Sequence, residues 1–157
     1  MTAKVEIEFT LNGRPRRVTV PADMSTLTLL REELGLTGSK LACGEGECGA
    51  CTILVDGVSQ NACLMFAVDC AGRDLLTIEG LRTEDALHPM QRAFVDHGAI
   101  QCGFCMPGMI MQAKYLADTT PGLTREGMRR GLEGNVCRCT GYKKVFDAVA
   151  DAAGIDG

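Results

Sequence analysis

Residues 43–52 read CGEGECGACT, a loop that interleaves three cysteines with three glycines. Glycine adopts positive φ angles readily and lets the backbone approach a bound group closely. Such a loop can wrap around a compact group and direct several backbone N–H groups toward it. Cysteine thiolates are the side chains that bind soft metal ions and iron–sulfur clusters. The loop therefore predicts a centre built from metal and thiolate.

The spacing of the cysteines indicates which metal the centre holds. Cys43, Cys48 and Cys51 follow C-x4-C-x2-C, and Cys63 comes after eleven further residues. The first three match the plant-type [2Fe–2S] ferredoxin pattern. Zinc also accepts four thiolates, but its sites usually combine two C-x2-C pairs, so the spacing favours an iron–sulfur cluster. The glycines also satisfy G-x-G-x-x-G, but a dinucleotide site would need a helix where a strand-like run follows.

The residues on either side of this loop predict a small mixed sheet with one helix. Alternating or β-branched runs, which are typical of strands, recur five times. The predicted strands cover residues 4–11, 16–20, 52–55, 58–64 and 75–78. Asn12-Gly13 and Asp56-Gly57 are hairpin signals within the first and second pair of strands. Leucines from Leu27 to Leu34, with Ser25 or Thr26 as cap and Gly35 as end, predict the helix.

Beyond residue 80 the apolar residues recur at helical spacing. The predicted helices cover residues 87–94, 109–116, 124–133 and 142–153. Four short helices with one apolar face each are typical of a bundle. We therefore expect an α+β chain with one domain over residues 1–80 and a helical domain over residues 81–157.

The helical half repeats one unit, in which a helix ends at a glycine and a cysteine pair leads into the next helix. The first unit holds Gly98, Cys102, Cys105 and Pro107, and the second holds Gly134, Cys137, Cys139 and Thr140. Proline favours the first helical position, and threonine favours the cap. Two such units related by an approximate twofold axis would bring four thiols together at positive helix N-termini. The set predicts a second cluster, with zinc or a redox-active C-x2-C pair as alternatives.

The ninth cysteine, the methionines and the net charge limit the functions that the chain can have. Nine of the 157 residues are cysteines, and two sets of four leave Cys70, which we expect to be a small buried residue or an inert thiol. Met106, Met109 and Met111 are expected to serve packing in the core or an interface. The net charge of −4 argues against nucleic-acid binding. Reduced thiols, no targeting signal and no apolar run of about 18 residues predict a cytoplasmic chain without a membrane span.

Three strings make the chain recognisable. CGEGECGACT at residues 43–52, QCGFCMPGMIM at residues 101–111 and GNVCRCTGY at residues 134–142 closely resemble the iron–sulfur subunit of the molybdenum hydroxylases. This family includes the xanthine dehydrogenases, aldehyde oxidoreductases and carbon monoxide dehydrogenases. The resemblance covers nearly the whole chain. Met106 departs from it, because the family commonly has threonine there, but this is not a ligand position.

The resemblance implies an N-terminal β-grasp, plant-ferredoxin-like domain and a C-terminal four-helix bundle, each with one [2Fe–2S] cluster. The implied ligands are Cys43, Cys48, Cys51 and Cys63 for the first cluster, and Cys102, Cys105, Cys137 and Cys139 for the second. Gln101 and Cys139 match the positions that the family places against molybdopterin. No catalytic residue is expected on this chain, because the hard chemistry belongs to the cofactors.

The resemblance also implies partners. A large subunit would hold molybdopterin and the substrate, and a medium subunit would usually hold FAD. Electrons would pass from molybdenum through the C-terminal cluster and then the N-terminal cluster to FAD or an external acceptor. The expected assembly is a heterotrimer that can dimerise.

Two other functions are compatible with the same cysteines. A free-standing two-cluster ferredoxin would serve several partners, whereas Gln101 beside a Met-rich apolar surface would fit a buried subunit interface. A zinc-stapled interaction module would be colourless, whereas iron–sulfur clusters of this kind are brown-red.

Overall fold

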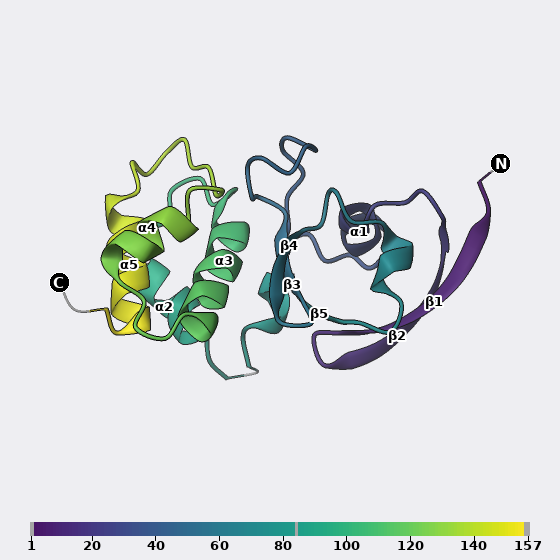
Figure 1. The fold of residues 1–157 in the computed structure, drawn as a ribbon, viewed down its shortest axis with the longest axis horizontal. Helices are drawn as coiled ribbons and strands as arrows, with labels where there is room; N and C mark the ends of the chain where they lie inside the picture. The colour runs from purple at the N-terminus through teal and green to yellow at the C-terminus, as the bar shows by residue number, and fades with distance from the viewer. Residues whose placement is uncertain (1, 84, 156–157) are drawn as a thin grey trace.

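The computed structural model describes residues 2–83 and 85–155. The chain has two halves that lie side by side, with a sheet near the N-terminus and a group of helices near the C-terminus (Figure 1). This arrangement confirms the α+β fold that the sequence predicts.

A five-stranded mixed sheet forms the N-terminal half. Its strands are β1 (Lys4–Leu11), β2 (Arg14–Pro21), β3 (Thr52–Val55), β4 (Val58–Asn61) and β5 (Asp74–Leu76). The order across the sheet is β2-β1-β5-β3-β4, in which β1 and β5 are parallel and the other neighbours are antiparallel. Two short 3-10 turns, Ala67–Cys70 and Ile78–Gly80, flank β5.

Both predicted hairpins are present. Asn12 and Gly13 have φ angles of 51° and 75°, and Asp56 and Gly57 have 50° and 79°. Two consecutive positive φ angles are what a two-residue turn between right-twisted strands requires. The second return strand is shorter than the predicted 58–64, because Leu64 N–H donates to the carbonyl of Asn61 over 3.0 Å and turns the chain.

The helix of the N-terminal half begins at the predicted place. Ser25 is the cap, and its hydroxyl accepts from Thr28 N–H over 3.1 Å. The helix runs through α1 (Thr26–Thr28) and widens into a π-helical turn, η1 (Leu29–Glu33). Its leucines are buried with the inner face of the sheet, which makes the first core.

Four helices form the C-terminal half, as predicted. They are α2 (Pro89–Asp96), α3 (Met106–Thr119), α4 (Arg125–Gly131) and α5 (Lys143–Ala153). Gly98, with a φ angle of 58°, follows α2 as expected. The predicted end of α4 at Glu133 is wrong by two residues, because α4 ends at Gly131 and Leu132 is its cap.

The predicted cap of α5 is also wrong. Tyr142, with a φ angle of 66°, occupies the cap position instead of Thr140. The Thr140 hydroxyl donates to the Sγ atom of Cys137 over 3.1 Å and accepts from Tyr142 N–H over 3.3 Å. Thr140 therefore stabilises the loop before α5 rather than its first turn.

The helices surround a second core, which meets the sheet along α3 and β3. A Cβ atom on Gly108 of α3 would lie only 2.0 Å from the carbonyl oxygen of Gly49, so this contact requires glycine. Met106, Met109 and Met111 are buried in the second core, so packing is confirmed and the expected Met-rich surface is wrong. The division between residues 80 and 81 stays a prediction. None of the described helices is long and apolar enough to span a membrane.

Candidate metal centres

The first set of cysteines lies on an irregular loop between η1 and β3 and on the turn after β4. Gly44, Gly46 and Gly49 have φ angles of 71°, 79° and 65°, which are the positive angles that the glycine pattern predicts. A Cβ atom on Gly46 would lie 2.4 Å from the Leu64 side chain, so the loop is also tightly packed. Glycine thus lets this loop fold back on itself.

In the first set, the thiols of Cys43 and Cys48 influence each other, and the Cys51 thiol is influenced by Cys63 and also by Cys48. A hydrogen bond from Glu45 N–H, with a distance of 3.4 Å from nitrogen to Sγ, and the neighbouring Cys48 thiol lower the pKa of Cys43 to about 6. Burial, together with the neighbouring Cys63 thiol, raises the pKa of Cys51 to about 12. Cys43 is thus a stabilised thiolate, and Cys51 is a buried thiol.

The second set lies on the loops that precede α3 and α5, and the structure brings its four thiols together in the same way. The Sγ atoms of Cys102 and Cys139, both exposed, are 3.5 Å apart. Cys105 and Cys137 are buried and also interact. Burial, followed by the Cys137 thiol, raises the pKa of Cys105 to about 12.

The surroundings of Cys137 favour its thiolate. Burial alone would raise the pKa of Cys137, but hydrogen bonds from the Thr140 hydroxyl and from nearby backbone N–H groups lower it overall. The N-terminus of α3 begins directly after Cys105, and its positive end of the helix dipole stabilises negative charge. This loop therefore offsets the charge of a thiolate-bound group.

The paired arrangement fits a two-iron cluster. In a [2Fe–2S] cluster two irons share four ligands, two on each iron. A zinc ion instead gathers four ligands around one point. Four neighbouring thiols in each set, with backbone N–H donors around them, fit a [2Fe–2S] cluster.

The loops of the two sets contact each other through three hydrogen bonds, which we call the seam. Val136 N–H donates to the Cys48 carbonyl over 2.9 Å. The Asn135 side-chain nitrogen donates to the Gly49 carbonyl over 3.1 Å and to the Thr52 hydroxyl over 3.4 Å. Sequence patterns do not reveal this seam, because its partners are at least 83 residues apart in the chain. The only signal was that Asn135 lies two residues before a predicted ligand.

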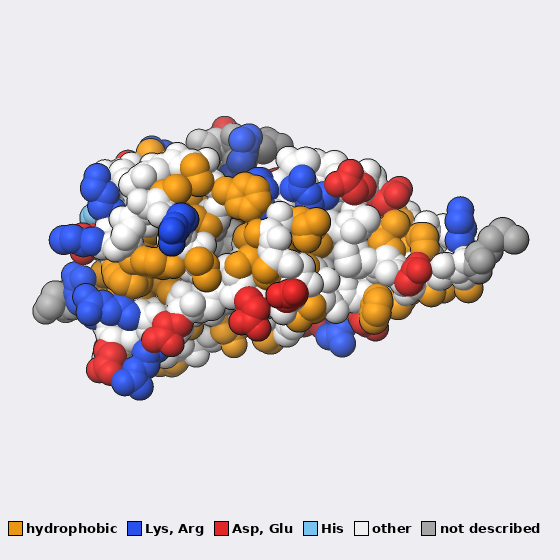
Figure 2. Space-filling model, turned by 90° about the horizontal axis from the view of Figure 1, so that it is seen from above, with side chains coloured by type: hydrophobic (Ala, Val, Ile, Leu, Met, Phe, Trp, Pro, Cys, Tyr) orange, Lys and Arg blue, Asp and Glu red, His pale blue; other side chains and the backbone are white. Residues whose placement is uncertain are grey.

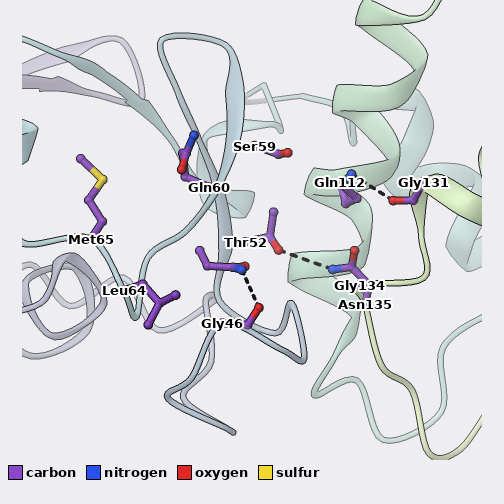
Figure 3. A pocket seen from close by; sticks show the side chains of 11 residues that line it. Gly46, Thr52, Ser59, Gln60, Leu64, Met65, Gln112, Gly131, Gly134 and Asn135 are labelled. Atoms are coloured by element: carbon purple, nitrogen blue, oxygen red, sulfur yellow. Dashed lines mark hydrogen bonds between the residues drawn. The ribbon is translucent and has the colours of Figure 1, made fainter.

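A pocket of about 500 Å³ opens beside the seam, between β4 and the helices α3 and α4 (Figure 3). Asn135 and Thr52 line it, and the Asn135 amide nitrogen points toward Thr52. Asn61, on the sheet side of the pocket, donates to the Gly46 carbonyl over 2.8 Å. The residues that line the pocket are polar, small or apolar, and none of them is charged.

The remaining predicted residues occupy contrasting places. Gln101 is exposed beside Cys102, on the surface of the second set. Cys70 is fully buried in the first core, with its Sγ atom 3.4 Å from the Thr26 hydroxyl, so its predicted burial is confirmed. Burial also raises the pKa of the Cys70 thiol.

Exposed apolar side chains gather around both sets. Six of the ten large apolar side chains that are exposed in the described chain lie within three residues of a cysteine of either set. They are Leu41, Leu64, Phe66, Ile100, Phe104 and Val136. The loop of the first set and the loop before α5 project to the same side of the molecule (Figure 1), and hydrophobic side chains spread over the face seen from that side (Figure 2).

Comparison with known proteins shows the same two units. A family described as "2Fe-2S iron-sulfur cluster binding domain" matches residues 9–69, and one described as "[2Fe-2S] binding domain" matches residues 77–150. The small subunit of nicotine 6-hydroxylase from Paenarthrobacter nicotinovorans is 46% identical over 151 residues, which cover 96% of this chain and 91% of the relative. This chain belongs to the iron–sulfur small subunits of the molybdenum hydroxylases.

Solved structures agree with this membership. Quinoline 2-oxidoreductase from Pseudomonas putida 86 contains a chain that superimposes on this small subunit with a TM-score of 0.92 and 42% identity, over 96% of this chain and 93% of the other. Aldehyde oxidoreductase from Desulfovibrio gigas gives a TM-score of 0.90 and 44% identity, but this small subunit covers only 17% of that longer chain. The small subunit therefore has two [2Fe-2S]-binding domains and belongs to an oxidoreductase family.

Proposed function

We propose that this small subunit transfers electrons between a molybdopterin centre on a large subunit and FAD on a medium subunit or an external acceptor. Each [2Fe–2S] cluster, when bound, takes up and releases one electron at a time. The proposed ligands are Cys43, Cys48, Cys51 and Cys63 for the first cluster, and Cys102, Cys105, Cys137 and Cys139 for the second. The paired thiols of each set support this assignment.

The observation that carries the proposal is the hydrogen bond of 2.9 Å between Val136 N–H and the Cys48 carbonyl. Cys48 belongs to the first set, and Val136 directly precedes Cys137 of the second. A short covalent path and one hydrogen bond therefore connect a proposed ligand of each cluster. Electrons moving between two bound clusters can follow such a path.

The exposed surface supports a partner at each set. Cys102, Cys139 and Gln101 are exposed, so a large subunit can place its molybdopterin against them. Exposed apolar side chains near both sets are typical of surfaces that a partner covers. We infer a heterotrimer that assembles in the cytoplasm, where thiols stay reduced.

The test is to purify the native complex through a tag on this chain and to measure its metals and partners. We expect about four iron atoms per small subunit, from two [2Fe–2S] clusters. We also expect molybdenum and a large subunit in equal amount to this chain. Zinc in place of iron would contradict the cluster assignment. Iron without molybdenum or a large partner would favour the free-standing ferredoxin.

A further inference from the structure

The two proposed cluster loops are attached to each other at the seam, and Asn135 is its centre. Only 4% of the surface of Asn135 is exposed. Its side-chain nitrogen donates to Gly49 and Thr52, which belong to the loop and strand of the first set. A buried amide with such donors holds its neighbours in one arrangement, because leaving its partners unpaired is costly.

Asn135 is also fixed to the second set through its backbone. Its carbonyl accepts a hydrogen bond of 3.1 Å from the Tyr142 hydroxyl. That hydroxyl accepts in turn from Cys137 N–H over 2.7 Å. One residue is therefore bonded through its side chain to the loop of Cys48 and through its backbone to the loop of Cys137.

The fit at the seam leaves no spare space. A Cβ atom on Gly49 would lie 2.4 Å from the Asn135 side-chain nitrogen and 2.5 Å from the Gly134 carbonyl. The Gly49 carbonyl also accepts from the Thr52 hydroxyl over 2.7 Å. The pocket of Figure 3 opens beside these atoms, so the close contact at the seam is confined to the two loops themselves.

We propose that Asn135 is a positioning residue that sets the separation and the electronic coupling of the two clusters. The proposal rests on the proposed function, since it requires a cluster at each set. Electron transfer slows steeply as the distance between two centres grows. Without the Asn135 amide, the neighbouring hydrogen bond from Val136 N–H to Cys48 would lengthen, and the direct path between the ligands would weaken.

The test is low-temperature electron paramagnetic resonance of the fully reduced complex. Two reduced clusters held close together split each other's signals magnetically, and the splitting depends on their separation and coupling. Asn135→Leu keeps the side-chain size and removes the donor. We expect the splitting to collapse toward two separate spectra while iron stays at about four atoms per chain. Unchanged splitting, or no splitting in the unaltered protein, would overturn the proposal.

Asn61→Leu is the matched control. Asn61 lines the same pocket and donates to Gly46 in the same loop, but its bond does not reach the helical half. We expect this variant to alter the signal of the first cluster and to retain the splitting. An equal loss of splitting in both variants would mean general loosening of the loop and would also overturn the proposal.

Thr52→Val is a second test, which applies if the Asn135→Leu variant fails to retain its iron. This variant removes one acceptor of the Asn135 amide and leaves Asn135 itself in place. A smaller decrease of the splitting is expected, and no decrease would contradict the inference. An unaltered complex without two [2Fe–2S] clusters would instead contradict the proposed function, so the two failures are distinguishable.

Discussion

At the scale of single residues, Cys139 tests the sorting of the cysteines. Its Sγ atom is exposed and lies 3.5 Å from that of Cys102. Serine is a poor ligand for iron, so Cys139→Ser should destabilise the second cluster while the first survives. Iron should fall from about four to about two atoms per chain, with one paramagnetic signal retained. Equal loss of both signals would show that the two sets do not bind separately.

Cys70→Ser is the control for that prediction. Cys70 is buried in the first core and contacts the Thr26 hydroxyl instead of a thiol of either set. Iron content should stay unchanged, although burying a hydroxyl costs roughly 1–3 kcal/mol of stability. Iron analysis and thermal unfolding together check both statements. Loss of iron would refute the division of the nine cysteines into two sets of four ligands and Cys70.

At the scale of elements, the contact of α3 with the first loop depends on Gly108. A Cβ atom there would lie 2.0 Å from the Gly49 carbonyl oxygen, which is backbone and cannot turn away. Gly108→Ala should therefore lower the free energy of unfolding by roughly 1–3 kcal/mol. Denaturant unfolding of the variant measures this change.

Gly127→Ala in α4 is the matched control, because a Cβ atom there would meet nothing closer than 3.4 Å. This substitution should change stability little or raise it by up to about 1 kcal/mol through helix propensity. A loss equal to that of Gly108→Ala would show that the close approach of α3 is not the cause.

The start of α2 makes stability depend on pH. His88 Nδ1 accepts from Met90 N–H over 3.2 Å, so the cap requires the neutral ring. Burial, helped by Lys114 and opposed by Asp118, lowers the pKa of His88 below its usual 6.5. At a pH below 6.5 the unfolded chain therefore binds more protons than the folded chain. The stability that the neutral His88 cap contributes is complete above pH 6.5 and is lost as the pH falls through the lowered pKa of the folded chain.

His88→Ser tests this dependence, since serine also caps helices but does not titrate. Between about pH 5 and pH 7 the unfolding temperature of the unaltered chain should rise more steeply than that of His88→Ser. Equal slopes would mean that the His88 cap does not contribute.

Most elements could be predicted from local patterns, and the exceptions have a common cause. Period-two runs with Asn12-Gly13 gave the first hairpin, because the turn and the strands depend on neighbouring residues. The cap of α5 and the end of the strand after Gly57 could not be predicted. Thr140 hydrogen-bonds to Cys137, and the chain turns at Asn61, so tertiary contacts override local preference there.

At the scale of the whole molecule, the family could be predicted from three strings, and the sets of cysteines came from their spacing. The seam could not, because Asn135 and Gly49 are 86 residues apart and no periodic pattern links them. The prediction of a Met-rich surface near Gln101 is also wrong. The methionines are buried in the core, and Ile100 and Phe104 are exposed instead. The spacing of the cysteines in the sequence predicts the ligands, whereas only the three-dimensional structure shows how the two sets of cysteines lie relative to each other.

A reductive titration of the purified complex, monitored by the visible absorption and the paramagnetic signals of the clusters, shows directly how many electrons this chain holds. We expect each small subunit to take up about two electrons, one on each of two spectroscopically distinct [2Fe–2S] clusters. We expect the small subunit of the Cys139→Ser variant to take up only about one electron. Uptake of a single electron by the unaltered small subunit, or of none, would contradict the presence of two electron-carrying clusters on this chain.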